Sequence, residues 1–458
     1  MLFTMRAAVF GDSAFNPAWS IPKITAAVPP KSNLPILPAS PSPLPPVAVA
    51  TDRRNLVLIA AFLGWMFDGL EMGIFPLVAR PALLEMQQAA GTVGDGYIGQ
   101  WMGIITALFL LGAALGGLVF GWLGDRVGRV RAMSLAILCY SLFTGVTYFA
   151  QTPLQLGVLR FVAALGMGGE WSLGVALVME VWPEKHRPLL AGVIGAAANV
   201  GFAVVGLIGI FFPVTQDSWR WVMLIGAAPA LLTFFIRLYV PESPRWLEAA
   251  RAGPARPLQE MLSRPLLRLT LIGSLLASIA LIGSWGSVQW LPLWADQMAG
   301  PTEPRAKAFV QTLTAVGSII GCLAGAWIGG RLGRRPAFFL LCLGSLGSCA
   351  WIFRGFDHYN SGFLAMTFLV GATTAAFYGW LPLYLPELFP TRVRATAQGV
   401  AFNAGRILAA AAAIQMGALM KMFEGSYAKA GAIITLVYVV GLVVIWLAPE
   451  TKGRPLPE

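Results

Sequence analysis

The sequence predicts an all-α integral membrane protein with twelve transmembrane helices in two six-helix bundles related by pseudo-twofold symmetry. Of its 458 residues, 57% are hydrophobic and 12% are charged, whereas soluble domains contain roughly 25% charged residues. Residues 51–458 contain twelve apolar segments, and each segment with its connection takes about 34 residues, enough for one spanning helix and a short loop. Three motifs also recur at an offset of 205 to 208 residues, which indicates that two halves of six helices repeat.

The predicted spans of the first half are 55–79, 97–123, 132–150, 154–181, 188–212 and 219–240. Those of the second half are 267–291, 309–328, 337–353, 361–385, 393–420 and 427–448. We therefore expect six-helix bundles over 51–240 and 267–448, a cytoplasmic linker over 241–266 and a cytoplasmic tail over 449–458. Residues 1–50 contain ten prolines and few charges, so we expect a disordered cytoplasmic extension.

Basic residues concentrate in the loops on one side of the predicted bundle. From Arg53 onward, the side shared by both chain ends carries twenty Lys and Arg residues, and the opposite loops carry seven. The positive-inside rule then predicts a multi-pass protein of the cell (plasma or inner) membrane with both termini in the cytoplasm. The net charge of +11 is explained by this topology, and we do not expect nucleic-acid binding.

Enzymatic chemistry has little support in the composition. The two histidines, His186 and His358, fall in predicted loops, so neither an H-E-x-x-H metal helix nor a Ser-His-Asp triad is supported. No lysine follows glycine in a phosphate-binding loop, and the four cysteines lie inside apolar segments, where they are expected to be core residues. The sequence predicts a protein that is not an enzyme, needs no cofactor or metal and functions as a monomer.

The internal repeat joins three pairs of motifs. Residues 122–132, Trp-Leu-Gly-Asp-Arg-Val-Gly-Arg-Val-Arg-Ala, return as 327–337, Trp-Ile-Gly-Gly-Arg-Leu-Gly-Arg-Arg-Pro-Ala. The Glu-x-x-Pro-x-x-x-Arg segment 180–187 returns at 387–394, and the Pro-Glu pair at 241–242 returns at 449–450. In each pair, the two copies follow equivalent helices of the two halves.

These motifs resemble those of the major facilitator superfamily, in its sugar-porter-related branch, and the resemblance covers residues 55–454. The segment Asp68-Gly-Leu-Glu71 is similar to the Asp-Gly-x-Asp of aromatic-acid symporters, with Glu71 in place of the second Asp. Residues 166–171, Gly-Met-Gly-Gly-Glu-Trp, and Asn403-Ala-Gly-Arg406 are similar to those of sialate, lactate and related symporters. The resemblance implies proton-coupled symport of a small organic anion (a monocarboxylate, sialate or aromatic acid) by alternating access. The seventh helix has no Gln-Gln pair of the kind that sugar porters use.

Alternating access requires contacts that form on whichever side is closed and break when that side opens. Charge-assisted pairs can serve in this way, and the expected ones join Asp125 to Arg126 and Arg129, and Glu180 and Glu387 to Arg187 and Arg394. The predicted cytoplasmic gate consists of Asp125, Arg126, Gly128, Arg129, Glu180, Arg187, Arg331, Arg334, Glu387 and Arg394. The alternative is that these are solvated topology charges. Because Gly330 stands where Asp125 stands in the first half, the second half-gate is expected to be weaker.

Five charged residues lie deep within predicted spans, where each unpaired charge costs roughly 2.5 to 3.5 kcal/mol. Asp68, Glu71, Arg160 and Glu170 are the predicted proton-coupling residues. Asp68 and Glu71 share one helix face, and the resemblance places Arg160 opposite Glu71. A permanent structural ion pair is the alternative, and for Glu170 plain packing in a Gly-rich helix is an equal one.

Arg406, the fifth deep charge, is the first candidate for holding an anionic substrate, because a guanidinium fork matches a carboxylate. The other predicted substrate-binding residues are Asn403, Asn199, Trp285, Gln289, Tyr378 and Trp380. For these side chains, packing or interhelical hydrogen bonds are the alternative. Trp290 and Trp294 are expected in an interfacial belt instead.

The expected partners are a small-molecule substrate, protons and the lipid bilayer. Two other functions are compatible with the sequence. A sugar or neutral-metabolite transporter of the same fold would carry its embedded charges for structure alone. A transport-derived sensor would bind its ligand without moving it across the membrane, usually with a long cytoplasmic tail.

Overall fold

The computed structural model describes residues 51–91, 95–212, 214–251, 257–300, 303, 305–424 and 426–457. The Pro-rich segment 1–50, for which disorder was predicted, lies outside these residues. The described residues form helices and connecting turns, with no strand among them.

The first half of the bundle runs from α1 to α7. Its elements are α1 (Thr51–Ala89), α2 (Asp95–Val127), α3 (Arg129–Val146), η1 (Thr147–Phe149), α4 (Pro153–Val181), η2 (Glu184–His186), α5 (Arg187–Phe211), α6 (Trp219–Ile225) and α7 (Ala230–Tyr239). Two short helices, α8 (Pro244–Arg251) and α9 (Pro257–Met261), lie between the halves in the chain.

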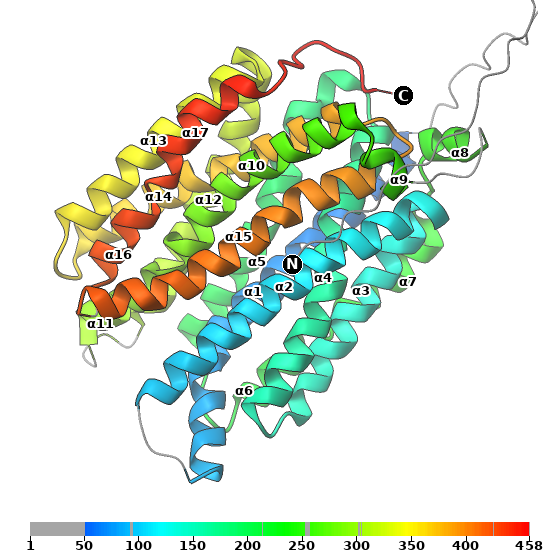
Figure 1. The fold of residues 1–458 in the computed structure, drawn as a ribbon. Helices are drawn as coiled ribbons and strands as arrows, with labels where there is room; N and C mark the ends of the chain where they lie inside the picture. The colour runs from blue at the N-terminus through cyan, green and yellow to red at the C-terminus, as the bar shows by residue number, and fades with distance from the viewer. Residues whose placement is uncertain are drawn as a thin grey trace, which may run out of the picture. The chain divides into compact units, whose positions relative to one another are not determined.

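The second half begins with α10. Its elements are α10 (Arg264–Gly286), η3 (Val288–Trp290), α11 (Leu291–Ala299), α12 (Ala306–Leu332), α13 (Arg334–Gly355), α14 (Ser361–Tyr384), η5 (Leu385–Leu388), α15 (Arg394–Met422), α16 (Tyr427–Ile434), α17 (Val437–Val444) and η6 (Ile445–Leu447). Figure 1 shows this half beside the first, with the helices of both running in a common direction.

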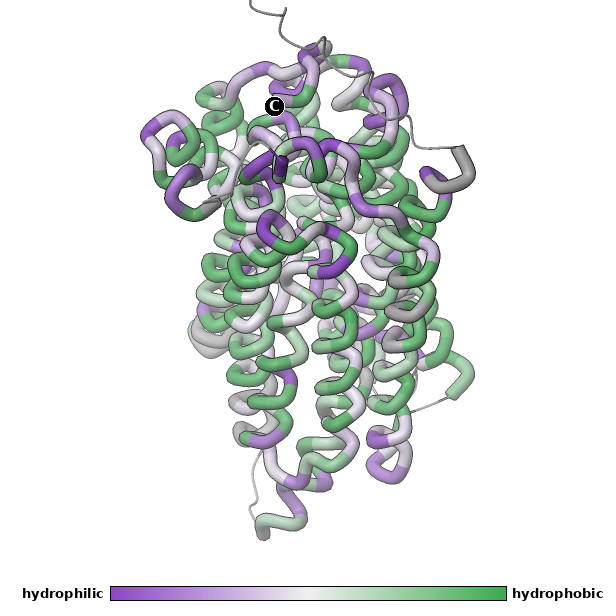
Figure 2. The backbone as a smooth tube through the Cα atoms, turned by 90° about the vertical axis from the view of Figure 1, so that its right-hand side faces the viewer, coloured by the Kyte–Doolittle hydropathy of each residue, from purple (hydrophilic) through white to green (hydrophobic). Residues whose placement is uncertain are grey.

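Eleven helices of the described chain are long and apolar enough to cross a membrane. The sixth predicted span, 219–240, is present as α6 and α7, separated by a turn over 226–229 that ends in Pro229. Proline removes a backbone donor and interrupts the helical hydrogen bonds, which explains why this span is divided. With it, the prediction of twelve spans in two bundles of six is confirmed. Figure 2 shows the hydrophobic residues along the middle of these helices.

Several helices begin where the sequence supplies a cap. Thr152 Oγ1 accepts a hydrogen bond from the backbone N–H of Gln155, whose side chain accepts one from Thr152 N–H. This reciprocal pair satisfies N–H groups that the first turn of α4 leaves free. Asn360 Oδ1 accepts from Phe363 N–H at the start of α14 in a similar way.

Glycines allow equivalent helices of the two halves to pack closely. In α2, Gly112 and Gly116 face the backbone carbonyls of α4, and in α12, Gly317 and Gly321 face those of α14. A Cβ atom at any of these positions would collide with the facing backbone. The two glycine pairs are 205 residues apart, so the repeat extends from the loop motifs into the helix packing.

Residues 124–131, 180–187, 329–335 and 387–394 lie together at one end of the helices, which we call the motif end. The opposite end is the far end. In Figure 1, α8, α9 and the C-terminus lie at the motif end, and α6 and α11 lie at the far end. Figure 2 shows hydrophilic residues gathered around the C-terminus at the motif end.

Candidate functional site

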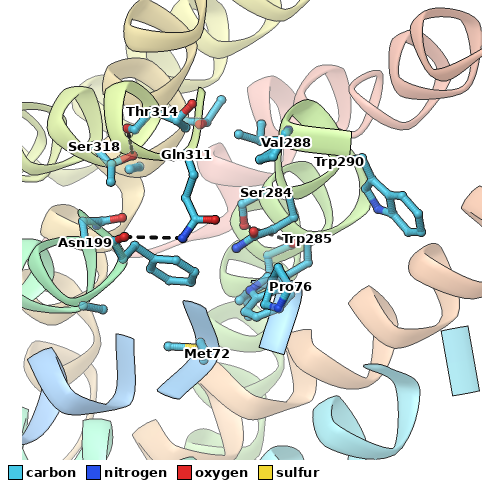
Figure 3. A pocket seen from close by; sticks show the side chains of 18 of the residues that line it. Met72, Pro76, Asn199, Ser284, Trp285, Val288, Trp290, Gln311, Thr314 and Ser318 are labelled. Carbon is cyan, nitrogen blue, oxygen red and sulfur yellow. Dashed lines mark hydrogen bonds between the residues drawn. The ribbon is translucent and has the colours of Figure 1, made fainter. Parts of the chain in front are cut away.

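A cavity of about 220 Å³ lies between the two halves and is lined by both. Its central wall includes Arg406 of α15 and Tyr378 of α14, and it extends to Trp290 and Lys307 near the far end. Figure 3 shows Gln311, Thr314 and Ser318 of α12 on one side and Ser284 and Trp285 of α10 on another. The cavity therefore runs from the middle of the bundle toward the far end.

The cavity wall contains many aromatic side chains, and its charged residues are basic. Eight aromatic side chains line it: Trp65, Phe75, Phe109, Phe202, Trp285, Trp290, Tyr378 and Phe402. Arg160, Lys307 and Arg406 are the charged residues of the described lining, which includes no Asp or Glu. This surface suits a small ligand that combines a flat apolar body with a negative charge.

Arg406 is buried in the cavity wall with 2% of its surface exposed. Its Nη1 donates to Asn403 Oδ1 at 2.9 Å, and its guanidinium carbon lies 5.4 Å from the ring centroid of Phe402. Among the described carboxylates, none forms an ion pair with Arg406 within 4.0 Å. Asp68 of α1 attracts it electrostatically from across the halves. The guanidinium thus keeps donors available for an anion.

The other deep charges form two carboxyl sites in the first half. Glu71 forms an ion pair with Arg160 of α4 and accepts a hydrogen bond from Thr144 Oγ1 at 3.3 Å. The Arg160 guanidinium also lies over the rings of Phe75 and Phe109, at 4.8 and 4.7 Å. The structure therefore pairs the two residues that the resemblance had placed opposite each other.

Asp68 and Glu170 form the second carboxyl site. Both are buried, 0% and 2% exposed, and the Glu170 carboxyl group packs against Gly64, which lies one helical turn before Asp68 on α1. No N–H or O–H group of another described residue donates to either carboxylate. Gly64 makes room for Glu170, because a Cβ atom on Gly64 would collide with its Oε1. A buried carboxyl pair without outside donors is a place where a proton can reside.

At the motif end, Arg129 of α3 is the centre of the first-half network. Its guanidinium pairs with Asp125 at 2.8 Å and Glu180 at 3.2 Å and donates to the carbonyl of Gly124 at 2.8 Å. Ser243 Oγ donates to Glu180 as well. All three charged side chains are fully buried, so their charges are held by partners instead of water.

The second half repeats this network. Arg334 pairs with Glu387 at 2.6 Å and donates to the carbonyl of Gly329 at 3.1 Å, and Thr451 Oγ1 donates to Glu387 at 2.6 Å. Gly330 supplies no carboxylate, and a Cβ atom there would press against the Pro188 ring. The second half therefore lacks the carboxylate that Asp125 supplies in the first half, and at Gly330 it packs closely against Pro188 of the first half instead.

A loop carboxylate completes each network by capping a helix. Glu242 accepts from the backbone N–H groups of Arg129 and Val130 at 2.9 and 3.1 Å, and Glu450 accepts from those of Arg334 and Arg335 at 2.9 and 3.0 Å. These N–H groups begin α3 and α13, where a negative charge is favourable. The sequence repeat identified both Pro-Glu pairs but not their capping role.

The glycine before each capped helix has a backbone conformation that other residues rarely adopt. Gly128 has φ 111° and Gly333 has φ 102°. Glycine reaches this region without a steric cost. Gly128, predicted as a gate residue, therefore acts through the backbone turn that presents Arg129 and its N–H group to their acceptors.

The two capping carboxyl groups, which lie outside the membrane spans, differ in acidity. Burial raises the pKa of Glu242 above its usual value, despite the N–H groups that donate to it. For Glu450, burial is outweighed by the N–H groups of Arg334, Arg335 and Lys452, and its pKa is lowered.

The motif end is closed by contacts between the halves. Asp125 accepts from the N–H and the hydroxyl of Thr396 at 2.8 and 2.6 Å. Arg394 pairs with Glu180 at 2.9 Å, and Arg129 donates to the carbonyl of Thr391 at 2.9 Å. Arg394 also donates to the carbonyl of Pro457 at 2.8 Å, which joins the C-terminal segment to the closure.

Three predicted gate residues have other contacts than expected. Arg126 is exposed and lies 5.0 Å from the Trp122 ring centroid instead of pairing with Asp125. Arg331 is also exposed, 5.3 Å from the Trp327 ring centroid. Arg187 pairs with Glu184 at 2.8 Å and not with Glu180, because Glu180 already holds Arg129 and Arg394. The expected pairings of Arg126 and Arg187 are therefore wrong.

The predicted substrate residues separate into two groups. Asn199, Trp285, Gln289, Tyr378 and Arg406 line the cavity. Trp380 does not: its Nε1 donates to the carbonyl of Arg334 at 3.0 Å, and its ring lies 4.8 Å from that of Phe338. Its predicted place in the cavity is wrong, because its position on α14 points it at the packed interior of the second half. Asn403 also lies outside the lining and holds Arg406.

Several residues that line the cavity were not predicted from the sequence. Gln311, Thr314 and Ser318 are polar residues scattered through the apolar α12, and Gln311 Nε2 donates to the carbonyl of Phe202 at 3.4 Å. Ser284 bonds the Tyr378 hydroxyl at 2.5 Å. Trp290, expected in an interfacial belt, lines the cavity instead, because the helix breaks at η3 and turns it inward. The polar residues could have been found by their spacing on one face of α12.

Two six-helix halves around a central cavity, closed at one end by repeated charge networks, define a membrane transporter and not an enzyme. The model of the Major Facilitator Superfamily matches residues 57–414, and the chain belongs to this superfamily.

The relatives of this chain are transport proteins of similar length. It is 30% identical to the inner membrane metabolite transport protein YgcS of Escherichia coli, over 77% of this chain and 84% of that protein. It is 28% identical to the cis,cis-muconate transport protein of Acinetobacter baylyi, over 81% and 89%, and 26% identical to the niacin transporter NiaP of the same organism, over 86% and 93%. The fold is similar to that of the proton:xylose symporter XylE, with TM-score 0.73 and 18% identity over 89% of this chain and 98% of that one.

Proposed function

We propose that this protein moves a small organic acid across the membrane together with a proton. The observation that carries the proposal is the cavity, in which aromatic walls surround Arg406 and the described lining contains no acidic residue. Arg406 would bind the substrate carboxylate through its free donors. The rings of Trp285 and Phe402 would then pack against the apolar body of the substrate.

The buried carboxyl groups support the proton as the coupled ion. One proton shared by Asp68 and Glu170 would supply the hydrogen bond that no other described residue gives to them. A second proton acceptor, Glu71, would release Arg160 when it is protonated. Asp68 attracts Arg406 without an ion pair between them. Protonation of Asp68 would leave the charge of Arg406 less compensated and so favour binding of the incoming anion, and this interaction would couple the two substrates.

The positive-inside count supports a cytoplasmic position for the motif end. The closed contacts there, with a cavity that extends toward the far end, correspond to a state that receives substrate from outside the cell. Opening of the motif end with closure of the far end would deliver the acid and the proton to the cytoplasm. A one-to-one symport of a proton and a monovalent anion moves no net charge, so the pH gradient alone would drive it.

The relatives favour acids with flat, unsaturated bodies, since two of them are named for cis,cis-muconate and niacin. A sugar substrate has less support, because a neutral polyol would leave the positive charge of Arg406 without a counter-charge in the cavity. The sugar-bound neighbour shares only the fold at 18% identity.

Uptake into proteoliposomes tests the proposal. The panel contains benzoate, nicotinate, cis,cis-muconate, a sialate, lactate and xylose, each measured with and without an inward pH gradient. We expect accumulation of at least one acid, about tenfold for each pH unit of gradient, and no dependence on membrane potential for a monovalent acid. Accumulation of xylose alone, or uptake of acids that ignores the pH gradient, would refute the proposed coupling.

A further inference from the structure

Asn403 contacts three parts of the molecule: the Arg406 guanidinium, its own helix and the opposite half. Its Oδ1 accepts from Arg406 Nη1 at 2.9 Å, and its Nδ2 donates to the carbonyl of Gly399 at 2.9 Å and to that of Gly168 on α4 at 3.0 Å. A guanidinium can only donate and a carbonyl can only accept, so these three partners fix the orientation of the amide. Asn403 is 1% exposed.

A glycine on the opposite half leaves space for the Asn403 amide. A Cβ atom on Gly117 of α2 would collide with Asn403 Nδ2, so glycine there leaves room for the side chain. Gly168 lies two residues before Glu170, and Asn403 lies three residues before Arg406. One amide thus connects the helix turn that carries a proposed proton acceptor with the helix turn that carries the proposed anion ligand.

The three bonds of Asn403 respond differently when the halves move. Those to Arg406 and Gly399 lie within α15 and can persist in any state. The bond to Gly168 joins the halves, as does the bond from Gln398 Nε2 to the carbonyl of Ser172. When the motif end opens, α15 and α4 separate, and one Nδ2 proton of Asn403 loses its acceptor. The amide can then rotate, and Arg406 loses its fixed neighbour.

We infer that Asn403 is a positioning residue that orients Arg406 for anion binding only while the motif end is closed. This inference rests on the proposed function of Arg406 as the anion ligand. The oriented Arg406 gives the acid a high affinity in the closed state. The affinity falls once the halves part, which favours release of the substrate at the motif end. Binding and release then depend on one amide that does not line the cavity.

Gln398 provides a matched control, because it lies five residues before Asn403 on α15, bonds across the halves to Ser172 and forms no hydrogen bond with Arg406. Both Asn403→Ala and Gln398→Ala should weaken the closed state. An Ala395→Cys reporter, buried at the start of α15, should therefore react faster with a hydrophilic maleimide in both variants. Asn403→Ser, which keeps a small polar side chain, is tested in parallel in case the alanine variant is not recovered as a monodisperse protein.

The decisive measurement compares an acid with its uncharged amide. KM for benzoate and nicotinate, and inhibition by benzamide and nicotinamide, are measured for the parent, Asn403→Ala and Gln398→Ala. For Asn403→Ala we expect KM for the acid to rise about tenfold more than in Gln398→Ala, with inhibition by the amides changed equally in both. A structural effect would change acid and amide together, and equal KM values in the two variants would overturn the inference.

Failure of the proposed function gives a different result. If the parent protein takes up none of the panel acids, the proposed function is refuted, and the labelling assay alone then tests Asn403. An Ala395→Cys labelling rate that stays at the parental value in both Asn403→Ala and Asn403→Ser would show that its bond to Gly168 does not hold the closed state, and the inference would fall with it.

Discussion

Replacing Asp125 by alanine should shift the protein toward the state in which the motif end is open. Asp125 is buried and accepts two hydrogen bonds from Thr396 of the other half, at 2.8 and 2.6 Å. A hydrogen bond to a charged group contributes about 1.5 to 3 kcal/mol. Water entering the open end would satisfy part of what is lost, so we expect a net change of roughly 3 kcal/mol, or a factor of roughly 100 in the ratio of closed to open protein.

The fold of the first half should survive this change. Arg129 keeps Glu180 and the carbonyls of Gly124 and Thr391 as partners. The assay is the rate of maleimide labelling of the Ala395→Cys reporter from the motif end, in membranes of known orientation. A parental labelling rate in Asp125→Ala would refute the reasoning. The matched control is Arg331→Ala, which removes an exposed charge at the same end and should leave labelling unchanged.

Three further predictions concern Arg406, Asp68 and the two capping carboxylates, Glu450 and Glu242. Arg406→Gln should raise KM for the transported acid by roughly 10- to 100-fold, and Arg406→Lys should restore only part of the loss because lysine lacks the planar fork; equal KM in parent and Gln variant would exclude Arg406 as the ligand. Asp68→Asn should abolish uptake driven by a pH gradient while leaving exchange of labelled for unlabelled acid, and gradient-driven uptake at the parental rate would reject its part in coupling. Ionised Glu450, whose pKa is lowered, stabilises the fold above the usual pKa of about 4.3, and this contribution is lost as pH falls through its lower folded value. Ionised Glu242, whose pKa is raised, opposes folding above its folded pKa. Glu450→Gln should therefore lower Tm at pH 7 more than Glu242→Gln, with the difference shrinking toward pH 3, and equal shifts at pH 7 would contradict this.

Much of the fold could be predicted from the sequence because a bilayer leaves few choices. A spanning segment must satisfy its backbone within one helix, so apolar length alone predicted α4, α12 and α14 to within a few residues. The helix breaks were missed for the same reason. Hydropathy does not register the loss of a backbone donor at Pro229, or the irregular turn before η3 at Ser287.

The site was harder to predict, because the partner of a buried charge depends on three-dimensional packing. The motif Glu-x-x-Pro-x-x-x-Arg suggested that Glu180 would face Arg187, which is near it in the chain. The structure instead gives Glu180 to Arg129 and Arg394, because these approach from α3 and from the other half. Asn403 was predicted to bind substrate from its place beside Arg406, and only the contacts with Gly168 and Gly399 show that it lies behind the cavity wall.

The capping contacts of Glu242 and Glu450 each remain within one half. Glu242 closes onto α3, and Trp246 of α8 donates to the carbonyl of Asp125 at 2.9 Å, so the segment through Arg251 belongs with the first half. Glu450 closes onto α13. Each half therefore carries its own capping carboxylate, and contacts such as those of Asp125 with Thr396 and of Glu180 with Arg394 hold the two halves together at the motif end. Two separately synthesised polypeptides, divided after Arg251, should find each other in the membrane and rebuild the same carrier.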